Sequence, residues 1–166
     1  MKMKRLDPRI AVVPGSFDPM TMGHKDIIKR ASVLYEKVIV GLLINPDKTY
    51  RFTQDERVKI AELTLSDISN AEIATDNGFL TDFCRKKGAK IILKGVRTTK
   101  DFVYEQEMAD FNRARDPELE TVYLPASPEL TDISSTCARA ILDAGGDLSG
   151  ILHPDVCAWL SEKQKD

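Results

Sequence analysis

The chain has little cysteine, no excess of charge of either sign and no apolar run long enough to cross a membrane. Its three cysteines, Cys84, Cys137 and Cys157, show no C-x-x-C spacing, which argues against a zinc cluster or a disulfide framework. The basic start, residues 1–5, lacks the apolar continuation of a signal peptide. These absences predict a cytoplasmic protein that is neither exported nor inserted into a membrane.

The charge balance argues against nucleic acid or an anionic membrane as a partner. With 24 basic and 26 acidic residues the formal net charge is −2, so no overall field attracts nucleic acid or an anionic membrane surface. Any basic site must therefore be local. A length of 166 residues, a hydrophobic content of 42% and the lack of a linker or repeat predict a single domain over residues 1–166.

Strand-like and helical patterns alternate along the chain. Short apolar runs with the β-branched content of buried strands occur at residues 10–13, 38–44, 71–75, 90–93 and 121–124. Helical spacing follows, with starts near His24, Thr53, Phe79, Asp101, Ser134 and Pro154. This alternation predicts an α/β, Rossmann-like fold with a five-stranded parallel sheet and helices on both faces.

In such a sheet the loops after the strands meet at one edge, where ligands bind. The loops expected there are residues 14–24, 45–52, 76–80, 94–100 and 125–136. They hold nearly all the unusual chemistry of the chain. The sequence therefore predicts one composite site at the carboxyl ends of the strands.

The first of these loops, residues 13–24, joins an apolar strand to an amphipathic helix, and Gly23-His24 lies at the helix start. Free backbone N–H groups and the helix dipole favour an anion there, and an imidazole can add hydrogen bonds in either protonation state. The simpler alternative is a structural turn in which His24 is a surface or cap residue. The combined features favour a polyphosphate site.

Two further segments have the chemistry of phosphate binding. Lys94, Arg97 and Lys100 place three cations in seven residues after a buried strand, where Gly95 would let the backbone approach an anion and Arg97 can hold two phosphate oxygens. Residues 133–136, Ile-Ser-Ser-Thr, offer hydroxyls and exposed N–H groups at a helix start. A solvated loop and ordinary helix caps are the alternatives.

Residues 15–24 resemble the G-x-F-D-x-x-T-x-G-H signature of the nucleotidylyltransferase superfamily, and residues 133–136 resemble its I-S-S-[ST] signature. Within the superfamily the chain is similar to the bacterial phosphopantetheine adenylyltransferases. The segments that carry this similarity are residues 45–48 (NPDK), 52–57 (FTQDER), 94–97 (KGVR), 101–105 (DFVYE) and 112–113 (NR).

The resemblance implies transfer of AMP from ATP to 4′-phosphopantetheine with Mg²⁺, giving dephospho-coenzyme A and pyrophosphate. It also implies a homohexamer, coenzyme A as a feedback ligand and no metal ligand on the protein. His24 would stabilise the transition state. Acceptor-binding positions would be Ser16, Lys48, Leu80 and Lys94. ATP-binding positions would be Ser16, Phe17, His24, Gly95, Val96, Arg97, Glu105, Leu130, Thr131, Asp132, Ile133, Ser134, Ser135 and Thr136.

This chain departs from the family pattern at three places. Ser16 stands where Thr is common, Lys94 stands where Arg is common, and Leu130-Thr131-Asp132 lacks the usual aromatic residues. Two alternatives stay open at this point: another adenylyl- or cytidylyltransferase of the superfamily, or a nucleotide sensor without catalysis. If the protein is a transferase, the phosphate monoester of the acceptor is itself a competent nucleophile. In-line displacement then needs no covalent intermediate with the protein.

Overall fold

The computed structural model describes residues 5–163. Residues 1–4 of the basic start and residues 164–166 lie outside it. The strands are β1 (Asp7–Gly15), β2 (Lys37–Leu43), β3 (Ala71–Asp76), β4 (Ala89–Val96) and β5 (Glu120–Pro125). The helices are α1 (Met22–Leu34), α2 (Gln54–Thr64), α3 (Leu80–Lys87), α4 (Thr99–Arg115), the 3₁₀ turn η1 (Pro128–Leu130), α5 (Ser135–Asp143) and α6 (Pro154–Lys163). No helix in this range is both long and apolar enough to cross a membrane.

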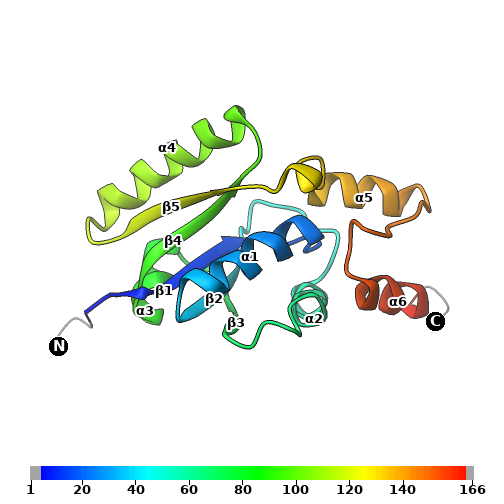
Figure 1. Ribbon diagram of the computed structural model, residues 1–166, viewed down its shortest axis with the longest axis horizontal. Coiled ribbons are helices and arrows are strands. Elements are labelled where there is room, and N and C mark those ends of the chain that lie inside the picture. The colour runs from blue at the N-terminus through cyan, green and yellow to red at the C-terminus, as the bar shows by residue number, and fades with distance from the viewer. Residues whose placement is uncertain (1–4, 164–166) are drawn as a thin grey trace.

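The five strands form one parallel sheet in the order β3-β2-β1-β4-β5 (Figure 1). This confirms the predicted fold class. The chain runs outward from β1 to β2 and β3, then returns to place β4 on the other side of β1. A crevice opens where the strand order reverses, so the carboxyl ends of β1 and β4 are the expected ligand edge.

Side chains alternate between the two faces of the sheet and build a core on each. On one face, Ala11, Val38 and Leu93 belong to the larger core, which also takes in residues of α1, α2, α5 and α6. On the other face, Val12, Ile39 and Ile92 pack with Phe83 of α3. Helices therefore cover both faces, as the alternation of strands and helices predicts.

Local signals in the sequence determine several helix ends. Thr53 and Glu56 form the predicted capping box at the start of α2, since the Thr53 hydroxyl accepts from the Glu56 N–H and the Glu56 carboxylate accepts from the Thr53 N–H. Gly88, with a φ of 71°, ends α3 in the left-handed conformation that favours glycine.

Several predicted boundaries are wrong, among them those of β1, which spans Asp7–Gly15 and not residues 10–13 alone. Strand β4 does not end at Leu93 but continues to Val96, because pairing with β5 runs on to Val96 opposite Pro125. Lys94 and Gly95 thus project from a strand and not from a loop. At the start of α4 the cap is Thr98, whose hydroxyl accepts from the Asp101 N–H, and Asp101 lies inside the first turn.

The role expected for Gly95 also changes. A Cβ atom at this position would lie 2.9 Å from Cγ1 of Ile27, so the missing side chain lets α1 pack against β4. We expect Gly95→Ala to lower the free energy of unfolding by about 1–3 kcal/mol, the usual cost of overpacking. Urea denaturation of the parent and the variant measures this difference in the free energy of unfolding. If the clash with Ile27 is the cause, Gly95→Ala/Ile27→Ala should lose less than the sum of the two single losses; strict additivity would contradict it.

Candidate active site

Two cavities open side by side at the carboxyl ends of β1 and β4. The first has a volume of about 510 Å³ and the second about 490 Å³. Six residues line both: Pro14, Gly15, Ser16, Lys94, Tyr104 and Glu105. Two ligands bound in these cavities would therefore meet at a shared wall formed by the first loop, the end of β4 and the start of α4.

Most of the residues predicted to bind ATP line the first cavity. They are Ser16, Phe17, His24, Gly95, Arg97, Glu105, Leu130, Ile133, Ser134, Ser135 and Thr136. Three others, Val96, Thr131 and Asp132, do not line it. Thr131 is still in contact with the site, because its carbonyl accepts a hydrogen bond of 3.5 Å from Nη1 of Arg97. All four residues predicted to bind the acceptor, namely Ser16, Lys48, Leu80 and Lys94, line the second cavity.

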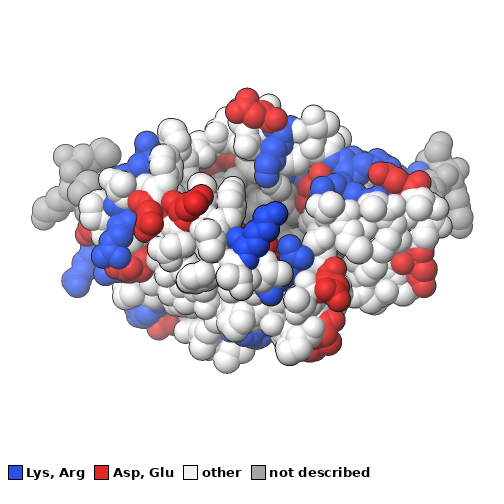
Figure 2. Space-filling view, turned by 90° about the horizontal axis from the view of Figure 1, so that it is seen from above, with Lys and Arg blue, Asp and Glu red and all other residues white. Residues whose placement is uncertain are grey.

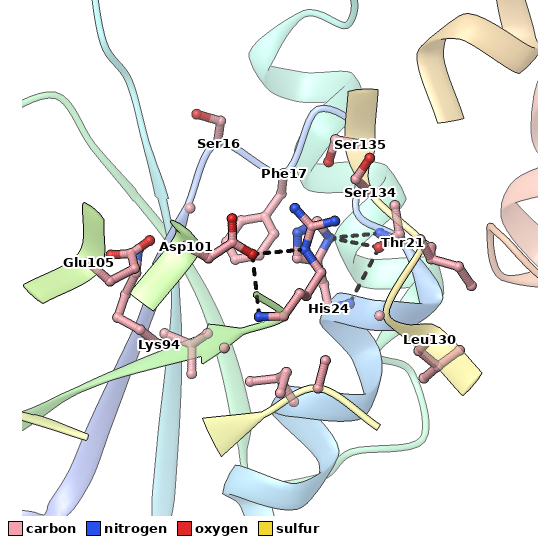
Figure 3. A pocket seen from close by; sticks show the side chains of 18 of the residues that line it. Ser16, Phe17, Thr21, His24, Lys94, Asp101, Glu105, Leu130, Ser134 and Ser135 are labelled. Carbon is pink, nitrogen blue, oxygen red and sulfur yellow. Dashed lines mark hydrogen bonds and ion pairs between the residues drawn. The ribbon is translucent and has the colours of Figure 1, made fainter. Parts of the chain in front are cut away.

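His24 lies at the third position of α1, and its ring is part of the helix cap. Nδ1 accepts a hydrogen bond of 2.9 Å from the Thr21 N–H, and the Thr21 hydroxyl accepts from the His24 N–H (Figure 3). An acceptor Nδ1 in a neutral imidazole requires the proton to be on Nε2. The cap alternative is thus correct, yet His24 also lines the first cavity, where this tautomer supplies an N–H donor.

The surroundings of His24 keep it neutral. Burial, then the charges of Arg97 and Lys94, lower the pKa of His24 from its ordinary 6.5 to about 4. At neutral pH the ring is therefore a neutral hydrogen-bond donor beside two cations. The sequence alone left both protonation states of the ring open.

The lowered pKa predicts a pH effect on stability. Between pH 6.5 and about 4 the unfolded chain binds a proton at His24 that the folded protein does not. The contribution of His24 to the free energy of unfolding is therefore complete above pH 6.5 and is lost as the pH falls towards 4. Imidazole resonances, with His24→Asn as the assignment control, should show no titration of His24 between pH 8 and 5.5. A midpoint near 6.5 would contradict this prediction.

Phe17 supports the His24 ring from the loop. Its backbone has a φ of 46°, the left-handed region that non-glycine residues rarely adopt, and its side chain is buried. The two rings meet edge to face with centroids 5.1 Å apart. A Cβ atom at Gly15 would lie 2.9 Å from the Phe17 ring, so the glycine of the motif makes room for it. Gly15 and Phe17 thus act together to place His24.

Basic side chains border the ligand edge. Figure 2 shows Lys and Arg side chains around a hollow near the middle of one face. Lys94, Arg97 and Lys100 line the first cavity. Lys94 pairs with Glu105 at 3.3 Å, and Arg97 pairs with Asp101 at 3.4 Å. In Figure 3 Lys94 and Glu105 lie across the cavity from Ser134 and Ser135. The arrangement combines cations, hydroxyls and a helix N-terminus, which suits a polyphosphate.

The part that α4 plays in the second cavity was not predicted from the sequence. Tyr104, Met108 and Phe111 line it from one side of the helix, although their helical spacing is typical of a core face. These residues are 61%, 39% and 49% exposed, so they do not pack into the core of this chain. Asp101, interpreted as a helix cap, lines the first cavity. The sequence signals for this region were its place directly after the basic strand end and the resemblance carried by residues 101–105, neither of which indicated the second cavity.

The described residues offer no ready-made metal centre. Within residues 5–163, no three His, Cys, Asp or Glu side chains lie close enough together to hold a metal ion. The carboxylates of the first cavity, Asp101 and Glu105, are already paired with cations. Any divalent ion at this edge would depend mainly on ligand oxygens and water, which is how proteins commonly hold Mg²⁺.

Two solved structures with a similar fold are described as nucleotide enzymes. A nicotinate-nucleotide adenylyltransferase from Vibrio parahaemolyticus superposes with a TM-score of 0.70 at 19% identity, over 92% of this chain and 91% of that one. A bifunctional NMN adenylyltransferase/ADP ribose pyrophosphatase from Francisella tularensis gives a TM-score of 0.65 at 19% identity, over 86% of this chain and 44% of that one. At this identity the likeness concerns the fold alone.

Sequence comparisons are more specific. Residues 12–141 match the cytidylyltransferase-like family. A phosphopantetheine adenylyltransferase from Heliobacterium modesticaldum is 43% identical over 95% of this chain and 94% of its own length. Proteins of the same name from Ralstonia pickettii, at 43% over 93% and 92%, and from Bordetella pertussis, at 41% over 95% and 93%, are similar. The chain therefore belongs to the cytidylyltransferase-like family and, within it, to the phosphopantetheine adenylyltransferases.

Proposed function

We propose that this enzyme, a nucleotidyltransferase, transfers the AMP group of ATP to the phosphate of 4′-phosphopantetheine, which gives dephospho-coenzyme A and pyrophosphate. Family membership supports the reaction. The observation that carries the assignment of the site is the pair of adjoining cavities with a shared wall at Ser16 and Lys94. A two-substrate transfer needs such neighbouring sites, because both reactants must be held in contact.

In this proposal ATP occupies the first cavity. Its phosphates lie among the N-terminus of α1, Arg97 and the hydroxyl-bearing residues 134–136, all of which favour anions. Arg97 is oriented for this role, since Asp101 pairs with Nε and the Thr131 carbonyl accepts a long hydrogen bond of 3.5 Å from Nη1, which leaves Nη2 to bind phosphate oxygens.

The acceptor occupies the second cavity, with its phosphate beside Lys48, Lys94 and Ser16. An oxygen of that phosphate attacks the α-phosphorus of ATP, the bond from the α-phosphorus to the bridging oxygen breaks, and pyrophosphate leaves with the electron pair. The Nε2–H of His24 donates to an α-phosphate oxygen as charge moves during the transfer. No group on the protein forms a covalent bond.

We also propose that Mg²⁺ enters with ATP. With Asp101 and Glu105 engaged in ion pairs, the phosphates and water would hold the ion and the protein would add at most one carboxylate. The chemistry that the ion supplies is neutralisation of phosphate charge.

The function is tested by incubating the protein with MgATP and one acceptor at a time, namely 4′-phosphopantetheine, nicotinate mononucleotide or a phosphorylated alcohol, and measuring pyrophosphate release. We expect pyrophosphate release when 4′-phosphopantetheine is the acceptor and none with the other two acceptors. Release with another acceptor would favour the alternative of a different transferase. ATP binding without any release would favour a sensor.

The remaining features implied by the resemblance are proposals as well. We propose a homohexamer, supported by the apolar side chains that α4 leaves exposed, among them Phe102, Val103 and Phe111. Light scattering measures the mass of the assembly.

Coenzyme A, which contains both the acceptor and the adenylate groups, is expected to compete with both substrates. The three free cysteines favour a reducing cytoplasm.

A further inference from the structure

Arg57 lies in the first half of α2 and lines neither cavity, yet its side chain is almost completely buried, with 2% of the residue exposed. Its Nη1 donates a hydrogen bond of 2.8 Å to the carbonyl of Ser16. Its guanidinium carbon lies 4.0 Å from the centre of the Tyr50 ring. Arg57 thus contacts two loops at once: the one that leads from β1 into α1 and the one that carries Lys48.

A second buried group joins the same two loops. The carboxylate of Asp18 accepts hydrogen bonds of 2.8 Å from the Arg51 N–H and 2.9 Å from the Phe52 N–H. Asp18 is itself 5% exposed. The loop with Lys48 is therefore held against the loop with Ser16 by one buried anion and one buried cation, acting at different points.

Stability alone explains Arg57 poorly. A buried guanidinium is costly unless its donors are paired, and an apolar side chain of similar volume commonly serves packing as well or better. Among the residues that the structure describes, Nε has no hydrogen-bond partner, and the bond from Nη1 goes to a neutral carbonyl. The position of this cation, directly behind a residue that lines both cavities, points to a role in the site.

We propose that Arg57 is a positioning residue for the acceptor, an inference that rests on the proposed function. By holding the Ser16 carbonyl, Arg57 orients the segment whose side chain lies in the shared wall. By stacking on Tyr50, whose hydroxyl accepts from the Asn45 N–H, it fixes the loop that places Lys48. Arg57 thereby keeps Ser16 and Lys48 at the separation that the acceptor's phosphate requires.

The test is a comparison of Michaelis constants. Arg57→Met should raise the KM for 4′-phosphopantetheine at least tenfold and the KM for ATP by a clearly smaller factor, because Ser16 lines the first cavity as well but the loop of Lys48 lines only the second. Arg57→Lys, which can still donate to Ser16 but cannot stack flat on Tyr50, should recover part of the effect. Tyr50→Leu leaves Arg57 in place and should raise the same KM by a smaller factor. Arg51→Met is the matched control, because the Arg51 side chain is half exposed and pairs with Asp143 at the surface; both its KM values should match the parent.

A role in stability alone would lower the folded fraction, and so kcat, without changing either KM. That result, or equal changes in both KM values, would overturn the inference. If Arg57→Met does not fold, as judged by circular dichroism, Arg57→Lys and Tyr50→Leu decide by the same criterion. If the parent protein itself releases no pyrophosphate with 4′-phosphopantetheine, the proposed function fails; if it does and the variants keep the parent KM, only this inference fails.

Discussion

His24→Ala should lower kcat about a hundredfold while the dissociation constant for ATP changes little. The neutral ring donates from Nε2, and we expect this bond to be strongest when charge moves on the α-phosphate during the transfer. Loss of one such preorganised donor costs roughly 3 kcal/mol in transition-state stabilisation. Steady-state kinetics give kcat, and calorimetry with ATP gives the dissociation constant.

The second histidine is the control for this prediction. His153 precedes α6 and lines neither cavity, so His153→Ala should keep the parental kcat. A His24→Ala enzyme with near-normal kcat would remove His24 from its proposed role. A large loss of ATP affinity with unchanged kcat would show that the bond is as strong in the ground state as in the transition state.

Lys48→Ala and Lys94→Ala should each raise the KM for 4′-phosphopantetheine by about ten- to a hundredfold, the range expected when a charge-assisted hydrogen bond to a dianion is lost. Both side chains line the second cavity. The effect of Lys94→Ala should be the larger, because it also leaves Glu105 without its partner at 3.3 Å and so exposes the acceptor to an unpaired carboxylate. Initial rates over a range of acceptor concentrations measure both changes.

Lys94→Arg is the informative companion to these variants. If residue 94 clamps a phosphate, a guanidinium should replace the ammonium with little loss, in keeping with the arginine that the family commonly places there. Calorimetric ATP binding should stay near the parental value in Lys48→Ala. If both alanine variants use 4′-phosphopantetheine like the parent, the acceptor is bound elsewhere and the proposed substrate is wrong.

Local sequence patterns predicted most of the fold. The capping box of Thr53 and Glu56, the left-handed Gly88 and the apolar strands all depend on residues close together in the chain. The prediction failed where partners are remote. Strand β4 extends past Leu93 because β5 pairs with it, and the apolar side of α4 faces a cavity because none of the elements within residues 5–163 covers it.

The candidate site divides in the same way. The motif around His24 and the basic residues after the fourth apolar run could be recognised from sequence, because residue type and spacing alone carry that information. The neutral state of His24 could not be, because it depends on burial and on two cations about 70 residues further along the chain.

The sequence by itself determined the order of strands and helices, the parallel topology and the family, since periodicity, capping and motif spacing are properties of neighbouring residues. Only the tertiary structure decided that Ser16 and Lys94 form a wall between two cavities, and that Arg57 joins the loops of Ser16 and Lys48 from behind. Distances and desolvation of this kind arise from the packing of elements that lie far apart in the chain, and no local pattern encodes them.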